Sequence, residues 1–211
     1  MVRVKICGIT NGADARLATR LGAGAIGLNF YRPSPRYITP AAARRIVRRL
    51  PRRVQAVGVF VNAPLQQIRR IARAVDLDFI QLHGDESPAM VERVAAEWPV
   101  IKAFRVRSAF RPAVLKQYAA ASAFLLDGFH PGLRGGTGKQ SDWRIARRAS
   151  RYGPIILAGG LGPGNIAAAI RAARPFAVDV NSGIESRPGR KDPAKLRAVM
   201  REIERINKRT R

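Results

Sequence analysis

Short runs of β-branched and other apolar residues alternate along the whole chain with longer stretches of helical periodicity. Runs of this length and composition are typical of strands buried in a parallel sheet. We place the strands at 2–7, 24–29, 54–60, 78–83, 100–105, 123–127, 154–158 and 176–181. We expect the helices at 11–21, 40–50, 64–75, 88–97, 109–121, 141–152, 163–173 and 192–208.

Several of the expected helices have a start signal in the sequence. Proline is favoured in the first turn of a helix, because the amide hydrogen that it lacks has no partner there. Such prolines occur in Thr39-Pro40, Asn62-Ala63-Pro64, Ser87-Pro88, Gly162-Pro163 and Asp192-Pro193.

Eight strands alternating with eight helices predict an α/β fold with a parallel sheet, and closure of that sheet removes its two edges. We therefore predict a single (β/α)8 TIM barrel that forms one domain over residues 1–211. The alternative is an open doubly wound sheet. That fold usually has fewer strands and a G-x-G-x-x-G turn after the first one, and this turn is absent here.

Length and composition agree with one folded domain. The chain has 211 residues, of which 46% are hydrophobic, enough to bury a substantial core. One cysteine cannot form an internal disulfide, so nothing indicates an oxidising compartment. The N-terminus lacks the apolar segment of a signal peptide, and no apolar run reaches membrane-spanning length. We expect a cytoplasmic protein with no membrane partner.

The net charge of +25 raises the alternative of a basic nucleic-acid-binding protein on a barrel scaffold. A nucleic-acid site usually concentrates charge on one face and adds aromatic residues or a reading motif. Here arginines occur along nearly every helical stretch, which favours a solvated basic shell and no specific nucleic-acid partner. Such a field still attracts small polyanionic substrates.

Alternation along the strands separates two faces. The first run places Val4 and Ile6 on the face that packs under helices, and Lys5 and Cys7 on the other. An isolated buried charge is costly, so polar groups on the second face either satisfy one another or form a site. Several acid–base groups at shared strand ends favour a site. The polar residues concerned are Asn29, Gln81, His83, Asp127, Asp179 and Asn181, of which His83, Asp127 and Asp179 are the acid–base groups.

Cys7 is the candidate nucleophile or base. A lone cysteine is most often an inert small apolar residue, but Cys7 ends the first strand and Lys5 lies two residues before it on the same face. An ammonium group there lowers the pKa of the thiol. If Asp179 instead neutralises Lys5, the effect on the thiol is small.

Glycine-rich connections follow three of the late strands. Residues 128–139 form a long connection after Asp127, which we interpret as a lid. The turns after strands seven and eight place glycines and helix starts where barrels often bind phosphate. The candidate phosphate-binding residues are Gly159, Gly160, Asn181, Ser182 and Gly183.

Two further residues are candidates for substrate binding. Arg36 lies in a proline-stiffened loop at 31–37, and its guanidinium group suits a carboxylate. The alternative for Arg36 is one more surface arginine. His83 has the chemistry of an acid or base, although hydrogen-bonded support within the mouth of the barrel is the favoured interpretation.

Eight short motifs occur in order along essentially the whole chain. They are KICGIT (5–10), SPRYI (34–38), GVFVN (58–62), QLHG (81–84), LLD (125–127), GGTGK (135–139), GGL (159–161) and VDVNSGIE (178–185). Each is weak by itself, but the ordered set is highly specific and resembles the phosphoribosylanthranilate isomerase family of tryptophan biosynthesis. Asn181 stands where serine is also common in that family.

The resemblance implies an Amadori rearrangement of N-(5-phosphoribosyl)anthranilate to 1-(2-carboxyphenylamino)-1-deoxyribulose 5-phosphate, without metal or organic cofactor. It implies that Asp127 is the general acid and that Cys7, as thiolate, is the general base. It also implies a small anionic substrate with phosphate and carboxylate groups, held by Arg36, Gln81, His83 and Asp179 and, at the phosphate, by Gly159, Gly160, Asn181, Ser182 and Gly183.

An alternative hypothesis is that the chain is the related sugar-phosphate barrel isomerase of histidine biosynthesis, or a bifunctional version of it. That chemistry commonly relies on paired aspartates, one of them at the first strand. Cys7 stands at that place here, which disfavours this reading. Monomer and homodimer both remain open.

Overall fold

The computed structural model describes residues 1–106, 109–128 and 140–209, and within them eight parallel strands close into a barrel. Each strand pairs with the next, and β8 pairs with β1, so the sheet has no free edge. This closure confirms the (β/α)8 prediction and excludes the open sheet. The strands are β1 (Arg3–Ile6), β2 (Ala25–Asn29), β3 (Gln55–Phe60), β4 (Phe79–Leu82), β5 (Val100–Arg105), β6 (Ala123–Asp127), β7 (Ile155–Ala158) and β8 (Ala177–Val180).

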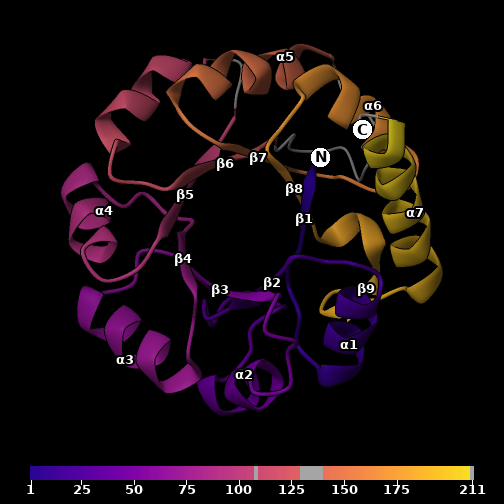
Figure 1. Ribbon diagram of the computed structural model, residues 1–211. Helices are drawn as coiled ribbons and strands as arrows, with labels where there is room; N and C mark the ends of the chain where they lie inside the picture. The colour runs from indigo at the N-terminus through magenta and orange to yellow at the C-terminus, as the bar shows by residue number, and fades with distance from the viewer. Residues whose placement is uncertain (107–108, 129–139, 210–211) are drawn as a thin grey trace.

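Helices surround the barrel as an outer ring (Figure 1). Most lie within a few residues of their predicted positions. They are α1 (Gly12–Arg20), α2 (Pro40–Val47), α3 (Leu65–Val75), α4 (Pro88–Ala95), α5 (Gln140–Ala149) with the 3₁₀ turn η2 (Ser150–Tyr152), α6 (Ile166–Ala173) and α7 (Pro193–Arg209).

The α-helix predicted at 109–121 is wrong in type. The connection between β5 and β6 holds a 3₁₀ helix, η1 (Pro112–Tyr118), which begins with an i→i+3 hydrogen bond from Val114 N to the Arg111 carbonyl oxygen at 3.1 Å. Leu115 is the buried side chain of this segment. An α-helix needs a continuous apolar stripe for its packing, and one buried residue does not supply it.

The proline signals were correct at three of the five helix starts. Pro40, Pro88 and Pro193 begin α2, α4 and α7. Pro64 instead precedes α3 as its N-cap. The prediction that Pro163 begins a helix is wrong, since α6 starts at Ile166. A turn precedes α6 because the Asn165 side chain binds the backbone before it. This side chain accepts from Gly162 N and donates to the Gly160 carbonyl oxygen, both at 2.9 Å.

Two apolar layers position the strands. A small cluster fills the barrel interior, and a larger one, including Val4 and Ile6, lies between the sheet and the helices. The separation of the strand faces predicted from alternation is therefore confirmed. The interior cluster consists of Val57, Ile101, Ala103, Ala123, Leu125, Ile156, Ala158 and Ala177.

A short hairpin after β8 was not predicted. The one-turn 3₁₀ helix η3 (Ser182–Ile184) leads into β9 (Glu185–Arg187), which pairs antiparallel with β10 (Arg190–Lys191). Gly189 turns the chain with φ 77°, in the left-handed region that favours glycine. The Thr10 hydroxyl donates to the Gly189 carbonyl oxygen at 2.5 Å, so the hairpin is tied to the loop after β1. Strands of two or three residues are too short to show periodicity in a sequence.

A buried ion pair joins β5 to the loops after β3 and β4. Lys102 in β5 is 2% exposed, and its ammonium donates to Glu86 Oε2 at 2.9 Å and to the Gly84 carbonyl oxygen at 2.8 Å. The Glu86 carboxylate in turn accepts from the backbone N–H groups of Asn62 and Gly84. The pair thus joins three consecutive strands, β3, β4 and β5, on the outer face of the barrel.

Substitution of Lys102 by Met should destabilise the fold by about 3–5 kcal/mol, because it leaves Glu86 as an uncompensated buried charge. Urea unfolding, monitored by circular dichroism, measures the free energy of unfolding of each variant. The double variant K102M/E86Q should lose less than K102M, and Lys208→Met, in an exposed pair, should have no measurable effect. Equal losses in K102M and K102M/E86Q would show that the charge pairing does not matter.

Candidate functional site

The carboxyl ends of β1, β2 and β8 bring Cys7, Arg36 and Asn181 together around two glycines. A methyl group on Gly27 in β2 would lie 2.6 Å from the Cys7 sulfur and 3.1 Å from Lys5 Nζ. A methyl group on Gly8 would lie 2.6 Å from Asn181 Oδ1 and 2.8 Å from Arg36 Cδ. Only glycine permits these approaches, so both positions are constrained by the side chains that surround them.

Cys7 lies beside a buried ion pair. Lys5 and Asp179 face each other where β1 pairs with β8, with Lys5 Nζ 2.8 Å from Asp179 Oδ2, and their side chains are 3% and 6% exposed. The second oxygen, Oδ1 of Asp179, is buried and has no hydrogen-bond partner among the described residues. Of the two alternatives drawn from the sequence, the structure shows the one in which Asp179 pairs with Lys5.

Lys5 acts to lower the pKa of Cys7, as the sequence predicted, but the other groups around the thiol outweigh it. Burial and the nearby Asp179 carboxylate raise the pKa of the Cys7 thiol above its ordinary value, and the ammonium of Lys5 offsets them only in part. Burial opposes the charge on Lys5, but Asp179 outweighs it and holds the pKa of Lys5 above its ordinary value. The resting site therefore favours the neutral thiol.

Asp127 ends β6 and faces a histidine from the end of β4. His83 Nε2 lies 3.7 Å from Asp127 Oδ2, and His83 Nδ1 lies 2.7 Å from Gln81 Nε2. If the Gln81 amide donates to Nδ1, a neutral His83 carries its proton on Nε2, toward Asp127. The amide oxygen of Gln81, Oε1, is buried with no hydrogen-bond partner among the described residues. Gln81, His83 and Asp127 thus form one chain of polar side chains.

Arg36 is held by a residue that sequence reasoning missed. Its guanidinium group contacts the Glu185 carboxylate through Nε at 3.0 Å and Nη2 at 2.6 Å. The loop that carries Arg36 is fixed by Ser34, whose hydroxyl accepts from Arg36 N at 3.2 Å and from Asn29 Nδ2 at 3.0 Å. The interpretation of Arg36 as one more surface arginine is wrong, since its side chain is 21% exposed and ion-paired.

Lys191 of the hairpin is the second residue that was missed. Its ammonium donates to Glu185 Oε1 at 3.1 Å and to Asn181 Oδ1 at 2.9 Å. Glu185 was visible in the sequence only as the last residue of the VDVNSGIE motif, and Lys191 lay outside every motif. Their pairing depends on the hairpin, which no local pattern indicated.

The two glycine-rich turns predicted to bind phosphate pack against each other. A methyl group on Gly183 would clash with the Leu161 carbonyl oxygen, and one on Gly162 would lie 3.0 Å from the Gly183 carbonyl oxygen. Gly160, with φ 61°, has open space where a side chain would begin. Gly159, with φ 96°, lies against Asp127 Oδ1. The structure therefore brings these turns to one place beside Asp127.

The lid predicted at 128–139 lies outside the described residues apart from Gly128. Within the described part of the chain, no group of three or more His, Cys, Asp or Glu side chains is arranged to hold a metal ion. None of the described helices is long and apolar enough to span a membrane.

Comparison with known proteins gives consistent matches. Residues 4–202 match the family described as N-(5'-phosphoribosyl)anthranilate (PRA) isomerase. The chain is 51% identical over 206 residues to the N-(5'-phosphoribosyl)anthranilate isomerase of Citrifermentans bemidjiense, covering 98% of each chain.

Solved structures agree with the sequence comparison. Phosphoribosyl anthranilate isomerase from Thermotoga maritima superposes with a TM-score of 0.90 at 41% identity, covering 97% of this chain and 99% of that one. A phosphoribosyl anthranilate isomerase in complex with reduced 1-(o-carboxyphenylamino)-1-deoxyribulose 5-phosphate superposes with a TM-score of 0.87 at 40% identity, over 97% and 99% of the two chains.

Substitution of Asp179 by Asn should lower the pKa of Cys7, because it removes a carboxylate that disfavours the thiolate. We expect alkylation of the free protein by iodoacetamide at pH 8 to be severalfold faster than in the unmodified chain, measured by mass spectrometry over time. Asp76→Asn, an exposed Asp at the end of α3, serves as the matched control and should leave the rate unchanged. An unchanged rate in D179N would mean that Asp179 does not govern the thiol.

Proposed function

Since the chain belongs to the N-(5'-phosphoribosyl)anthranilate isomerase family, we propose that it converts N-(5'-phosphoribosyl)anthranilate to 1-(2-carboxyphenylamino)-1-deoxyribulose 5-phosphate in tryptophan biosynthesis. The observation that carries this proposal within the site is the placement of Cys7 and Asp127. A thiol beside an ion pair and a carboxyl group beside a histidine stand at carboxyl ends of strands in the same closed barrel.

Asp127 is the general acid in this proposal. It protonates the ring oxygen of the furanose as the bond from that oxygen to C1′ breaks, and the lone pair of the amine nitrogen forms the C=N bond of the iminium. His83, 3.7 Å from the carboxylate, is placed to support Asp127 and to restore its proton. Gln81 fixes the ring of His83 through Nδ1.

Cys7 is the general base. Its thiolate removes the proton from C2′, and the electron pair of that C–H bond moves into a C1′–C2′ double bond while the iminium nitrogen becomes neutral. The resulting enolamine then loses its hydroxyl proton and gains one at C1′, which gives the ketone. The iminium supplies the electron sink within the substrate itself.

Because the pKa of Cys7 is raised, ring opening also affects the ionisation of the thiol. Ring opening produces a cationic iminium, and a positive charge beside the sulfur favours the thiolate. Formation of the intermediate therefore assists the deprotonation that the next step needs. The Cys7 thiol is therefore mostly neutral in the resting site and ionises once the iminium has formed.

The remaining site residues bind the substrate in this proposal. Arg36 binds the anthranilate carboxylate. The unpartnered Oδ1 of Asp179 accepts from a sugar hydroxyl, since a buried carboxylate oxygen without a donor is costly. The phosphate lies at the packed turns after β7 and β8, which provide Gly159, Gly160, Asn181, Ser182 and Gly183.

These residues come from strands around the whole barrel, so we propose that residues 1–211 act as one catalytic domain. The cytoplasmic location stays a prediction from the sequence, and monomer and homodimer both stay open.

A turnover assay that follows the loss of fluorescence of the N-substituted anthranilate tests the proposal directly. Cys7→Ser should lower kcat on the order of 10³-fold, because a hydroxyl is a far weaker acid than a thiol and supplies almost no anion near neutral pH. Binding of the reduced product by titration calorimetry should stay within about threefold, which shows that the site is intact. Turnover of C7S at the rate of the unmodified chain would reject Cys7 as the base.

Opposite protonation of Cys7 and Asp127 predicts a bell-shaped pH dependence of kcat/KM where chemistry limits the rate. The ionisation of the Cys7 thiol lies on the alkaline side of this profile, because the pKa of Cys7 is raised. Asp127→Asn should lower kcat by about 10²–10⁴-fold, remove the falling limb and be partly restored by added acetic acid. A falling limb that persists in D127N would assign the acid to another group.

A further inference from the structure

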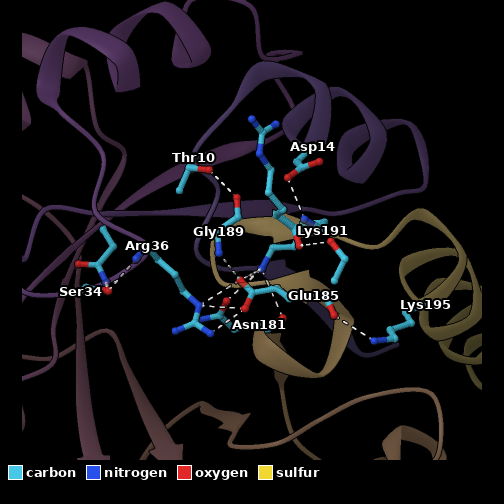
Figure 2. A network of polar contacts seen from close by, with 12 residues as sticks. Thr10, Asp14, Ser34, Arg36, Asn181, Glu185, Gly189, Lys191 and Lys195 are labelled. Atoms are coloured by element: carbon cyan, nitrogen blue, oxygen red, sulfur yellow. Dashed lines mark hydrogen bonds and ion pairs between the residues drawn. The ribbon is translucent and has the colours of Figure 1, made fainter.

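The Glu185 carboxylate is the centre of a buried polar network at the end of β8 (Figure 2). It accepts from Arg36 Nε at 3.0 Å, from Arg36 Nη2 at 2.6 Å, from Lys191 Nζ at 3.1 Å and from Gly189 N at 3.2 Å. The Glu185 side chain is 4% exposed. A carboxylate with this many donors has a single orientation.

The network holds two cations against one anion. Burial acts against the charge of Glu185, but the hydrogen bonds from Arg36 and Lys191 outweigh it and hold its pKa below the ordinary value. Lys191 is more deeply buried, and desolvation lowers its pKa despite the attraction of Glu185. One unit of positive charge is left over within these three side chains, which is the charge that an anionic ligand neutralises.

Lys191 links this network to the turn after β8. Besides Glu185, its ammonium contacts the Asn181 side chain at Oδ1, 2.9 Å away, and the Asn181 carbonyl oxygen at 3.3 Å. Because the amide oxygen faces the ammonium, the NH₂ group of Asn181 is left as a donor. An unbroken series of contacts thus runs from Arg36 through Glu185 and Lys191 to Asn181.

Arg36 also keeps one edge for another partner. Glu185 occupies Nε and Nη2, and no described residue accepts from Nη1. A guanidinium group has two edges that suit a carboxylate, so one edge is anchored while the other is presented.

The hairpin has further tethers besides the contacts made by the Glu185 and Lys191 side chains. The Lys191 N–H donates to Asp14 Oδ2 at 2.9 Å, and Asp192 N donates to the Ile184 carbonyl oxygen at 2.8 Å. Thr10 binds the Gly189 carbonyl oxygen. The hairpin is thus tied at several points that do not involve the charged groups of Glu185 and Lys191.

We propose that Glu185 and Lys191 are positioning residues that fix the carboxylate-binding edge of Arg36 relative to the phosphate-binding amide of Asn181. This inference rests on the proposed function, which gives Arg36 and Asn181 those two ligands. The network then sets the separation at which the site accepts a carboxylate and a phosphate on one substrate. Both residues act through others and do not touch the reacting atoms.

The test is a double-mutant cycle between Glu185→Gln and Arg36→Met, with kcat and KM measured for each variant. Glutamine at 185 keeps the shape, but its oxygen accepts from only one of the two cations and its NH₂ group faces the other. Affinities for two probes, anthranilate and ribose 5-phosphate, are measured in parallel by titration calorimetry. Glu202→Gln, in an exposed pair with Arg205 on α7, is the matched control.

We expect E185Q to raise KM and to weaken anthranilate binding by about tenfold, with kcat changed less than about twofold, because ground-state and transition-state binding are lost together. Ribose 5-phosphate binding should stay unchanged. In the R36M background, E185Q should add no further effect on anthranilate binding, since Glu185 acts on the carboxylate through Arg36. E202Q should match the unmodified chain in every measurement.

Lys191→Met gives a separate expectation. It releases both Glu185 and Asn181, so it should weaken anthranilate and ribose 5-phosphate binding together, and Lys191→Arg should restore part of both. If E185Q fails to fold with two uncompensated cations, the double variant E185Q/K191M removes one charge of each sign. Weakened binding of both probes is expected there as well.

Unchanged probe affinities and KM in E185Q would overturn the proposal, as would full additivity with R36M, which indicates a general structural defect. The proposed function fails in a different way, through absence of turnover in the unmodified chain. Because calorimetry needs no turnover, the positioning role is tested in either case.

Discussion

The ion pair between Lys5 and Asp179 is the interaction on which the site depends. It lies where the last strand of the barrel meets the first, and it joins residues 174 positions apart in the chain. Closure of the barrel brings the two charges together, and their proximity makes the burial of both tolerable. The same carboxylate then acts on Cys7, so the closure of the fold and the acidity of the thiol are coupled through one side chain.

Buried charge elsewhere in the molecule follows a similar rule. Lys102 is paired with Glu86 on the outer face of the barrel, and Arg36 and Lys191 share Glu185 at its mouth. The Lys102–Glu86 pair has one cation and one anion, and both are hydrogen-bonded to the backbone of the loops that they join. It leaves no charged group for a ligand. The Glu185 network has one cation in excess and an unused guanidinium edge. This difference separates a structural cluster from one that is completed by a substrate.

The sequence allowed the barrel and most of the candidate site to be predicted, because the parity of a strand places a residue on a definite face and all strands of a parallel barrel end at one mouth. Asp127 and His83 were found together for that reason. Glu185 and Lys191 were missed because a hairpin of five residues in two strands has no periodicity. The direction of the Cys7 pKa shift was wrong because it depends on the balance of burial and two opposite charges, which needs distances. The 3₁₀ helix η1 was mistaken for an α-helix because composition does not show how little of it is buried.

The arrangement of charge also accounts for a substrate that carries two acidic groups. Lys5, Arg36 and Lys191 stand against Asp179 and Glu185, so these contacts hold one more cation than anions. The basic surface of the chain adds a long-range attraction for anions, which salt weakens, whereas the buried contacts are screened much less. In the proposed function, a phosphate and a carboxylate then neutralise the site from two ends. In the proposed mechanism their binding leaves the centre, where Cys7 lies, to respond mainly to the charge that forms on the reacting carbon and nitrogen.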